Sequence, residues 1–417
     1  MTRAVALIDG EHYAPVVRAA LAELPYDVVA AHLLGGTEKL SGEDDYGVPL
    51  ADTLERALDE HRPELVVDLS DEPVLGPRER FAVASRVLAR GLPYVGADFR
   101  FDPPVFEPFE LPSIGIVGTG KRVGKTAITA HAAQLLSRDR KLVVVAMGRG
   151  GPAEPEVVNV APTVDALLEL ADAGRHAASD HLETAALTGV TTVGCRRCGG
   201  GLAGAVFASN VHDGARRAAE LEPELVLFDG SGAALPPVET RRRILVVNAQ
   251  QDPDVVTGYL NGYRHLISDL VVLTMAEQGS GWEQLGERAA ELAPSVVATT
   301  LRPRPAEPVD GRRVAFFSTA PESAHDRFRR HLADEHGAEV VHVSGNLSNR
   351  AKLRGELASV DAEVFLVELK AAAIDVVAAA GRERGVDVVL SGSDVLSVGD
   401  GPGLDAELQR LAAEATA

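Results

Sequence analysis

The sequence has little cysteine, few aromatic residues and no excess of positive charge. Its 417 residues include two cysteines, Cys195 and Cys198, which cannot build a disulfide framework and fit a reducing compartment. Aromatic residues make up 4% of the chain, which argues against the base-stacking surfaces of proteins that bind single-stranded nucleic acid. Asp and Glu number 61 against 41 Lys and Arg, and the resulting net charge of −20 repels nucleic acids and anionic membranes.

Long apolar runs are also missing. No run approaches the roughly 20 residues that a membrane-spanning helix requires, and residues 1–9 lack the apolar core and cleavage site of a signal peptide. We therefore expect a cytoplasmic protein whose partner is neither a membrane nor a nucleic acid. A polyanionic small molecule would need a local cluster of cations in such an acidic chain.

The residues that are present have the composition of a globular protein, 46% hydrophobic and 24% charged. Short apolar runs alternate with amphipathic stretches, which is typical of a parallel sheet covered by helices. Prolines at 103, 104 and 108 and again at 303, 305 and 308 interrupt this alternation. We therefore expect an α/β fold with a central doubly wound parallel sheet, one of whose strands is 203–208, between two smaller α/β domains. The expected domains are 1–108, 109–301 and 302–417.

A glycine-rich turn between an apolar run and a helical pattern is the strongest functional signal. Residues 113–126 read SIGIVGTGKRVGKT and hold two of the six lysines of the chain, Lys121 and Lys125. A strand, a glycine-rich turn and a helix that opens with Gly-Lys-Thr predict a phosphate-binding loop, whereas a simple tight turn needs only the glycines. In such a loop backbone N–H groups surround the phosphates, Lys125 reaches the β and γ oxygens, and the Thr126 hydroxyl ligates Mg²⁺.

The loop departs from the strict motif in one respect, because position 119 holds Thr and Gly118 lies one residue too far upstream. The predicted nucleotide-binding residues of the loop are Gly118, Thr119, Gly120, Arg122, Val123, Gly124, Lys125 and Thr126.

Two further strand ends carry polar residues. The run 225–228 ends in Asp229, followed by Gly-Ser-Gly, and a carboxylate at the C-terminal end of a parallel strand points into the ligand crevice. Beside a phosphate loop we expect Asp229 to hold the metal with Thr126, although an ordinary Asp-Gly turn would have the same sequence. Asn248 ends another apolar run, and its amide could bind an adenine edge or only cap the next turn.

Arginines and glycines gather in two further segments, 147–151 and 194–201. Guanidinium groups match phosphate oxygens, and glycines allow the backbone to approach a ligand, so these segments suggest a second anion site. A solvated loop is the alternative.

Cys195 and Cys198 form a Cys-x-x-Cys pair, but zinc needs more ligands and the spacing of His176, His181 and His212 matches no zinc module. We interpret both cysteines as small packing residues. The predicted substrate-binding residues are Arg149, Asp180, His181, Arg196, Arg197, Gly199 and Gly200.

Taken together these segments, with 9–13 (DGEHY), 179–181 (SDH) and 228–232 (FDGSG), resemble the cyclic 2,3-diphosphoglycerate synthetase family over essentially the whole chain. Residues ~112–300 also resemble dethiobiotin synthetase and its relatives among the P-loop proteins, in which a small residue stands in place of Arg122.

The resemblance implies an ATP- and Mg²⁺-dependent cyclising ligase that closes 2,3-diphosphoglycerate into its cyclic form. It further implies a homodimer and a catalytic set of Lys125, Lys121, Arg149 and Asp229. Two alternatives remain at this point: a dethiobiotin-synthetase-like ligase that activates a carboxylate, and an ATPase that switches a protein partner.

Overall fold

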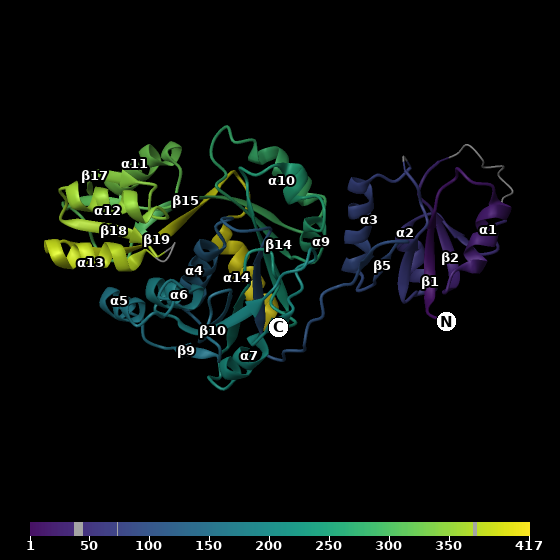
Figure 1. The fold of residues 1–417 in the computed structure, drawn as a ribbon, viewed down its shortest axis with the longest axis horizontal. Coiled ribbons are helices and arrows are strands. Elements are labelled where there is room, and N and C mark those ends of the chain that lie inside the picture. Colours follow the sequence, from purple (N-terminus) through teal and green to yellow (C-terminus); the bar gives the residue numbers. More distant parts are fainter. Residues whose placement is uncertain (37–44, 73, 370–372) are drawn as a thin grey trace. The chain divides into compact units, whose positions relative to one another are not determined.

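The computed structural model describes residues 1–36, 45–72, 74–369 and 373–417 and forms two compact units (Figure 1). The first unit comprises Met1–Val105 together with Gln251–Ile267, and the second comprises Phe106–Gln250 and Ser268–Ala417. Both are α/β, as expected. The predicted domain boundaries near 108 and 301 stay predictions. Among the described residues, no helix is both long and apolar enough to cross a membrane.

The first unit is a six-stranded sheet in the order β3-β2-β1-β4-β5-β6. The central strands β1 and β4 are parallel neighbours, so their carboxyl ends meet at the point where the strand order reverses. The elements are β1 (Arg3–Ile8), α1 (Ala14–Glu23), β2 (Asp27–Leu33), β3 (Leu50–Ala51), α2 (Leu54–His61), β4 (Leu65–Asp68), α3 (Pro77–Ala89), β5 (Tyr94–Val95), β6 (Arg100–Phe101), α8 (Pro253–Val256) and α9 (Asn261–Leu266).

Helices α8 and α9 belong to the first unit although they lie between two strands of the second. Helix α9 packs against α3, and the Ser85 hydroxyl of α3 donates a hydrogen bond to the Tyr259 carbonyl at 2.9 Å. Arg78 and Asp254 form an ion pair at 2.7 Å. The chain therefore leaves the second unit after β13, contributes two helices to the first, and returns to form β14.

The second unit is built on one sheet in the order β11-β10-β8-β12-β7-β13-β14-β15-β19-β18-β16-β17, with β9 beside β10. Its first elements are β7 (Ser113–Gly118), α4 (Lys125–Leu136), β8 (Leu142–Gly148), β9 (Glu156–Val158), α5 (Val164–Asp172), α6 (Asp180–Thr188), β10 (Thr191–Cys198), β11 (Ala208–Ser209), α7 (Val211–Ala219), β12 (Leu225–Asp229), β13 (Arg242–Asn248) and β14 (Leu270–Thr274).

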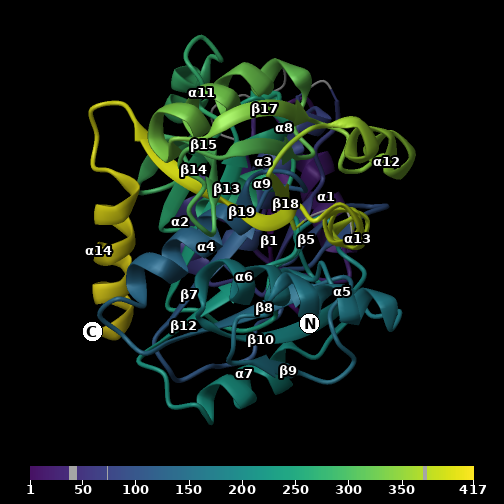
Figure 2. The same cartoon turned by 90° about the vertical axis from the view of Figure 1, so that its left-hand side faces the viewer.

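The remaining elements are α10 (Trp282–Ala290), β15 (Val296–Pro305), β16 (Arg313–Phe317), a 3₁₀ turn (Glu322–Ala324), α11 (His325–His336), β17 (Glu339–Ser344), α12 (Arg350–Ser359), β18 (Val364–Glu368), α13 (Ile374–Arg384), β19 (Asp387–Val398) and α14 (Leu404–Thr416). Helix α14 packs against α4 and β7, so the end of the chain helps to close the core over the phosphate-loop strands (Figure 2).

Side-chain alternation along β12 decides where its last residue points. Leu225 and Leu227 face the core beneath α4, while Val226 and Phe228 face the core beneath α7. Because successive strand residues point to opposite faces, Asp229 lies on the α4 side. The strand thus delivers a carboxylate to the helix that follows the phosphate loop.

Two details of the predicted strands are wrong. Residues 203–207 form no strand: the Gly204 N–H donates to the Gly201 carbonyl at 3.0 Å to close a turn, the short edge strand β11 begins only at Ala208, and the longer strand beside it is β10. Its Gly194 and the two arginines conceal the strand pattern in the sequence, where 194–201 resembles a loop.

The expected interruption at 303–305 is also absent, because β15 continues to Pro305. Beyond Ala298 it pairs only with β19, so its prolines lie where one side of the strand carries no ladder.

Two helical glycines provide a matched test of this packing. A Cβ on Gly214 of α7 would meet the buried Cys195 sulfur at 2.1 Å, whereas a Cβ on Gly355 of α12 would meet nothing within 4 Å. We expect Gly214→Ala to lower the free energy of unfolding by about 1–3 kcal/mol, because α7 must move away from β10. Gly355→Ala should raise it by about 0.5–1 kcal/mol. Urea titrations of both variants measure this; equal effects would contradict the close approach of α7 to Cys195.

Candidate nucleotide and anion site

A cavity of about 640 Å³ opens at the carboxyl ends of the strands of the second unit. One side of it is the phosphate loop with residues 148–151 and 178–180, and the other side comes from the C-terminal part of the chain. The cavity therefore collects segments that are up to about 270 residues apart in the sequence, between Gly120 and Ser393.

The phosphate loop has the predicted strand–turn–helix context. Strand β7 ends at Gly118, and α4 begins at Lys125 after Gly124, whose φ of +80° suits glycine. A Cβ on Gly118 would lie 2.8 Å from the Val123 side chain and 3.0 Å from the Gly232 carbonyl. This close approach explains why glycine occupies position 118 although the strict motif would place it at 119. Arg122 adopts a positive φ of 60° and lines the cavity.

Lys125 and Asp229 form a buried ion pair at the floor of the site. The Lys125 ammonium lies 2.5 Å from Asp229 Oδ1, which also accepts a hydrogen bond from the Thr129 hydroxyl at 2.7 Å. Asp229 is fully buried, and its Oδ2 has no hydrogen-bond partner among the described residues. A buried carboxylate oxygen with a free lone pair, with Thr126 in the cavity wall, fits the oxygen ligands that Mg²⁺ prefers.

Asp180 begins α6 and lines the same cavity. Burial raises the pKa of its carboxyl; Lys125 opposes this shift and the nearby Asp229 adds to it. Its Oδ2 lies 3.3 Å from the position of a Cβ on Gly148, so a larger residue at the end of β8 would crowd this carboxylate. The structure thus places a carboxyl group with a raised pKa beside the predicted phosphate-loop lysine.

Arg149 and Arg197 are close enough to affect each other electrostatically. Burial lowers the pKa of Arg197 and the Arg149 charge lowers it further, while Asp180 raises it. Arg197 donates to the carbonyls of Gly199 and Ser231, the latter at 3.0 Å. Ser231 lines the cavity with Arg149. Two guanidinium groups at one edge of a phosphate loop suit an anionic ligand, because a bound anion relieves their mutual repulsion.

The matches with known families agree with this geometry. Three models of cyclic 2,3-diphosphoglycerate synthetase match the chain: its N-terminal domain over residues 3–102, its P-loop domain over 113–297 and its C-terminal domain over 305–394. The chain belongs to the cyclic 2,3-diphosphoglycerate synthetase family. The family resemblance seen in the sequence is therefore confirmed.

Individual relatives match over nearly their whole length. The cyclic 2,3-diphosphoglycerate synthetase of Rubrobacter xylanophilus is 50% identical over 98% of this chain and 97% of its own. Those of Methanothermus fervidus and Thermococcus kodakarensis are 42% and 43% identical, over 92% and 94% of this chain and 91% and 95% of their own. Among solved structures, LpxK from Aquifex aeolicus in complex with ATP aligns at a TM-score of 0.43 and 14% identity, over 75% of this chain and 91% of its own.

Several predicted site residues of this synthetase-family chain lie outside the cavity lining. His181 is buried at 4% exposure and packs on Gly194, where a Cβ would come within 2.6 Å of the ring. Arg196 is exposed, and its backbone is held by Asn210 and Ser209. Gly199 and Gly200 contribute to the turn around Arg197 and not to the lining.

The two cysteines differ in their surroundings. Cys195 packs in the core beneath α7, as predicted, whereas Cys198 is exposed, so its packing role is wrong. Among the described residues, neither cysteine joins His176, His181 or His212 in a cluster with the geometry of a metal site.

Asn248 lines the cavity and also caps a turn, so the two alternatives for it are compatible. Its side-chain oxygen accepts a hydrogen bond from the Gln250 N–H at 2.9 Å, and its side-chain nitrogen donates one to the Arg122 backbone carbonyl at 3.4 Å. The side chain therefore connects the end of β13 with the phosphate loop.

The C-terminal wall was missed by sequence reasoning. It includes Phe316, Thr319, Arg327, Phe328 and Glu368, together with an Arg302–Glu277 pair whose two hydrogen bonds are 2.7 and 2.9 Å long. Burial raises the pKa of Glu277, but the hydrogen bond and charge of Arg302 lower it by more. Thr319, Glu277 and Glu368 all follow or end strands, which is the signal that the sequence offered for this wall. Lys370, two residues after Glu368, lies outside the described residues.

The first unit brings the start of the segment 9–13, which takes part in the family resemblance, next to Asp71. Asp9 follows β1 and accepts hydrogen bonds from the Glu11 N–H at 3.0 Å, the His12 ring at 3.1 Å and the Asp71 N–H at 3.2 Å. Asp71 follows β4, the neighbouring strand. This cluster orders the carboxyl edge of the sheet within the first unit.

Protonation of His181 should destabilise the protein in acid. Burial lowers the pKa of His181 to about 4 from 6.5, so the folded state holds the neutral ring between these values while the unfolded chain takes up a proton. Stability is thus present above pH 6.5 and is lost as the pH falls towards 4, by about 1.4 kcal/mol per pH unit. His181→Asn should weaken this dependence between pH 6.5 and 4, measured by urea unfolding. Equal slopes in both proteins would refute the burial of a neutral ring.

Proposed function

We propose that this chain closes 2,3-diphosphoglycerate into cyclic 2,3-diphosphoglycerate, with ATP as phosphoryl donor and Mg²⁺ as the metal. The observation that carries the proposal is one cavity that joins a phosphate loop to paired arginines, in a chain of this synthetase family. We further propose that it acts in the cytoplasm, as its composition suggests, and as a homodimer, as the family resemblance implies.

The reaction has two phosphoryl-transfer steps. In the first, an oxygen of one substrate phosphate attacks the γ-phosphorus of ATP, the bond to the β-phosphate breaks, and ADP leaves. In the second, an oxygen of the other substrate phosphate attacks the phosphorus of the first substrate phosphate. The phosphoryl group that came from ATP leaves as inorganic phosphate, and the ring closes. Neither step needs a covalent enzyme intermediate, so positioning and charge neutralisation supply the catalysis.

Repulsion between anions is the main obstacle to both steps. Each pair of like charges at 4 Å costs about 1 kcal/mol in water and about 4 kcal/mol at an effective dielectric constant of 20. Lys121, Lys125, Arg122 and Arg149 line the cavity, and Arg197 contacts its edge through Ser231. These cations make the cavity attractive to polyanions within a chain of net charge −20.

Lys125 and Asp229 have complementary tasks. Lys125 forms an ion pair with Asp229 in the structure. When the Lys125 ammonium contacts the transferring phosphoryl group, that group would replace Asp229 as its anionic partner. Asp229 Oδ2 and the Thr126 hydroxyl would hold Mg²⁺, which would neutralise charge on the β and γ phosphates. Asp180 lines the same cavity, and the raised pKa of its carboxyl makes it a candidate to exchange a proton with a substrate phosphate.

The two alternative functions have less support. A carboxylate-activating ligase has no need of the Arg149–Arg197 pair, and a partner-switched ATPase has no need of a second anion site at all. The full-length matches carry the name of the synthetase and not of either alternative.

Phosphorus NMR tests the reaction directly. Wild-type protein with ATP, Mg²⁺ and 2,3-diphosphoglycerate should give new anhydride resonances of the cyclic product, and Lys125→Ala should lose about 10²–10³-fold or more of the rate. Lys352→Ala, at an exposed site on α12, is the matched control and should keep full activity. ATP hydrolysis without cyclic product, independent of the substrate, would favour a switch ATPase and refute the synthetase.

Kinetics of arginine variants test the anion site. Arg149 lines the cavity and Arg196 does not, so Arg149→Ala should raise the KM for 2,3-diphosphoglycerate about tenfold or more, as a lost charged hydrogen bond of ~1.5–3 kcal/mol predicts. Arg196→Ala should change this KM by less than about threefold, because exposed charges contribute little. A larger effect of Arg196→Ala would place the substrate elsewhere.

A further inference from the structure

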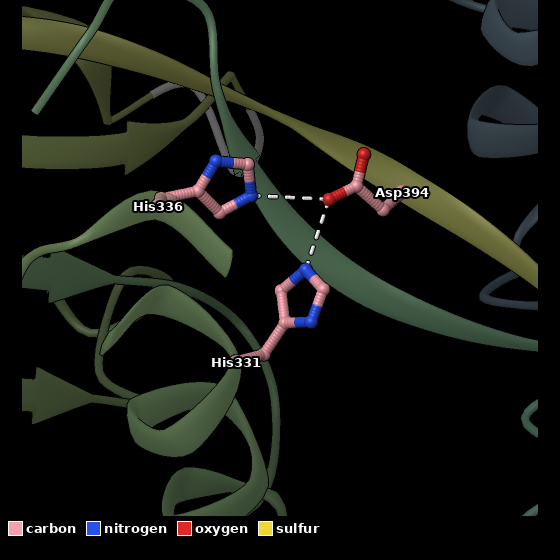
Figure 3. A group of neighbouring side chains, drawn as sticks. All are labelled: His331, His336 and Asp394. Carbon is pink, nitrogen blue, oxygen red and sulfur yellow. Dashed lines mark hydrogen bonds and ion pairs between the residues drawn. The ribbon is translucent and has the colours of Figure 1, made fainter. Parts of the chain in front are cut away.

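Two histidines and one aspartate converge in the C-terminal part of the second unit, away from the residues of the proposed reaction. His331 Nε2 lies 2.9 Å and His336 Nε2 lies 3.1 Å from the same oxygen, Asp394 Oδ2 (Figure 3). One ligand atom from each residue lies within 4.8 Å of the other two. All three side chains are only 10–24% exposed.

Helix geometry alone does not explain this convergence. His331 and His336 are five positions apart on α11, which separates residues by about 140° around a helix, so a helix face would not bring the two rings together. His336 is the last residue of α11, before Gly337 in the left-handed conformation, and Figure 3 shows both rings directed at the carboxylate of β19. The end of the helix and the strand together create the cluster.

We propose that His331, His336 and Asp394 bind a divalent transition-metal ion, with Zn²⁺ the best match. Two imidazole nitrogens and one carboxylate oxygen are ligands that Zn²⁺ accepts, and three protein ligands leave a fourth position for water. To coordinate through Nε2, each neutral ring carries its proton on Nδ1. The three ligand atoms lie within 4.8 Å of one another, close to the separation of ligands around an ion with bonds of ~2.0–2.2 Å.

The charge around the cluster is compatible with a bound cation. Arg304 Nε lies 3.9 Å from the other carboxylate oxygen, Asp394 Oδ1, while its Nη2 donates to the Gln134 side chain at 2.6 Å. Arg304 therefore approaches the carboxylate oxygen that the histidines do not contact. Oδ2 remains available to the metal.

A metal at this position would brace the C-terminal wall of the cavity. Phe328 of α11 lines the cavity one turn before His331, and Ser393 of β19 lines it one residue before Asp394. Since strand residues alternate, Asp394 points to the face opposite Ser393. The ion would join α11 to β19 behind the wall and so stabilise the fold without contacting the substrates.

Metal binding to the full chain tests the proposal. Protein stripped with a chelator should bind one Zn²⁺ by isothermal titration calorimetry, and Co²⁺ should give the strong visible absorption of a four-coordinate site. His331→Gln and Asp394→Asn should each weaken binding at least tenfold. His342→Gln is the control, because His342 Nε2 has one carboxylate, Glu356, at 3.7 Å and belongs to no three-ligand group in the described part of the chain. Co²⁺ at the phosphate loop would be distinguished by weak octahedral absorption.

Thermal unfolding separates a metal site from a hydrogen-bonded cluster. With a metal site, Zn²⁺ raises the Tm of wild-type and His342→Gln protein but not of His331→Gln or Asp394→Asn. An equal increment in all four proteins, or no stoichiometric binding to wild type, would overturn the proposal and leave a hydrogen-bonded cluster only. The Zn²⁺-dependent increment is the readout, so a general loss of stability in the variants does not affect the conclusion.

Discussion

The ion pair between Lys125 and Asp229 is the constraint on which the second unit depends. A buried charge that loses its partner costs several kcal/mol, so the strand, the loop and the helix that supply the two groups must keep their register. Alternation along β12 directs Asp229 to α4, and Thr129, one turn after Lys125, binds the same oxygen. The floor of the cavity is therefore fixed by core packing, while the arginines at its rim remain accessible to a ligand.

Local chemistry could be predicted from the sequence because it depends on neighbouring residues. The phosphate loop lies within fourteen residues of chain, and Asp229 ends a run whose apolar pattern marks a buried strand. The α/β class followed from the same alternation. Position 118 shows the limit of a motif: glycine is required there by the approach of Val123 and Gly232, a contact that spacing alone does not reveal.

Features that depend on distant pairing could not be predicted. Strand β10 resembles a loop because glycine and arginine interrupt it, yet β8 on one side and β9 on the other stabilise it. The prolines suggested that the strand ends near residue 303. In the structure β15 continues to Pro305, because its pairing with β19 on one side does not need the N–H group that proline lacks. His181 has the residue type of a ligand, and only the packing on Gly194 shows that its ring is enclosed by protein.

The segment between β13 and β14 belongs to the first unit, so neither unit is a continuous stretch of chain. The first unit is joined to the second by three covalent connections, at 105–106, 250–251 and 267–268, and not by a single linker. Removing residues 1–105 would therefore leave α8 and α9 without the rest of their unit, because α9 packs against α3 and the segment Gln251–Ile267 is joined to the second unit at both ends. A shortened or recombined chain that keeps only the second unit would therefore still carry residues 251–267, which belong to the first unit.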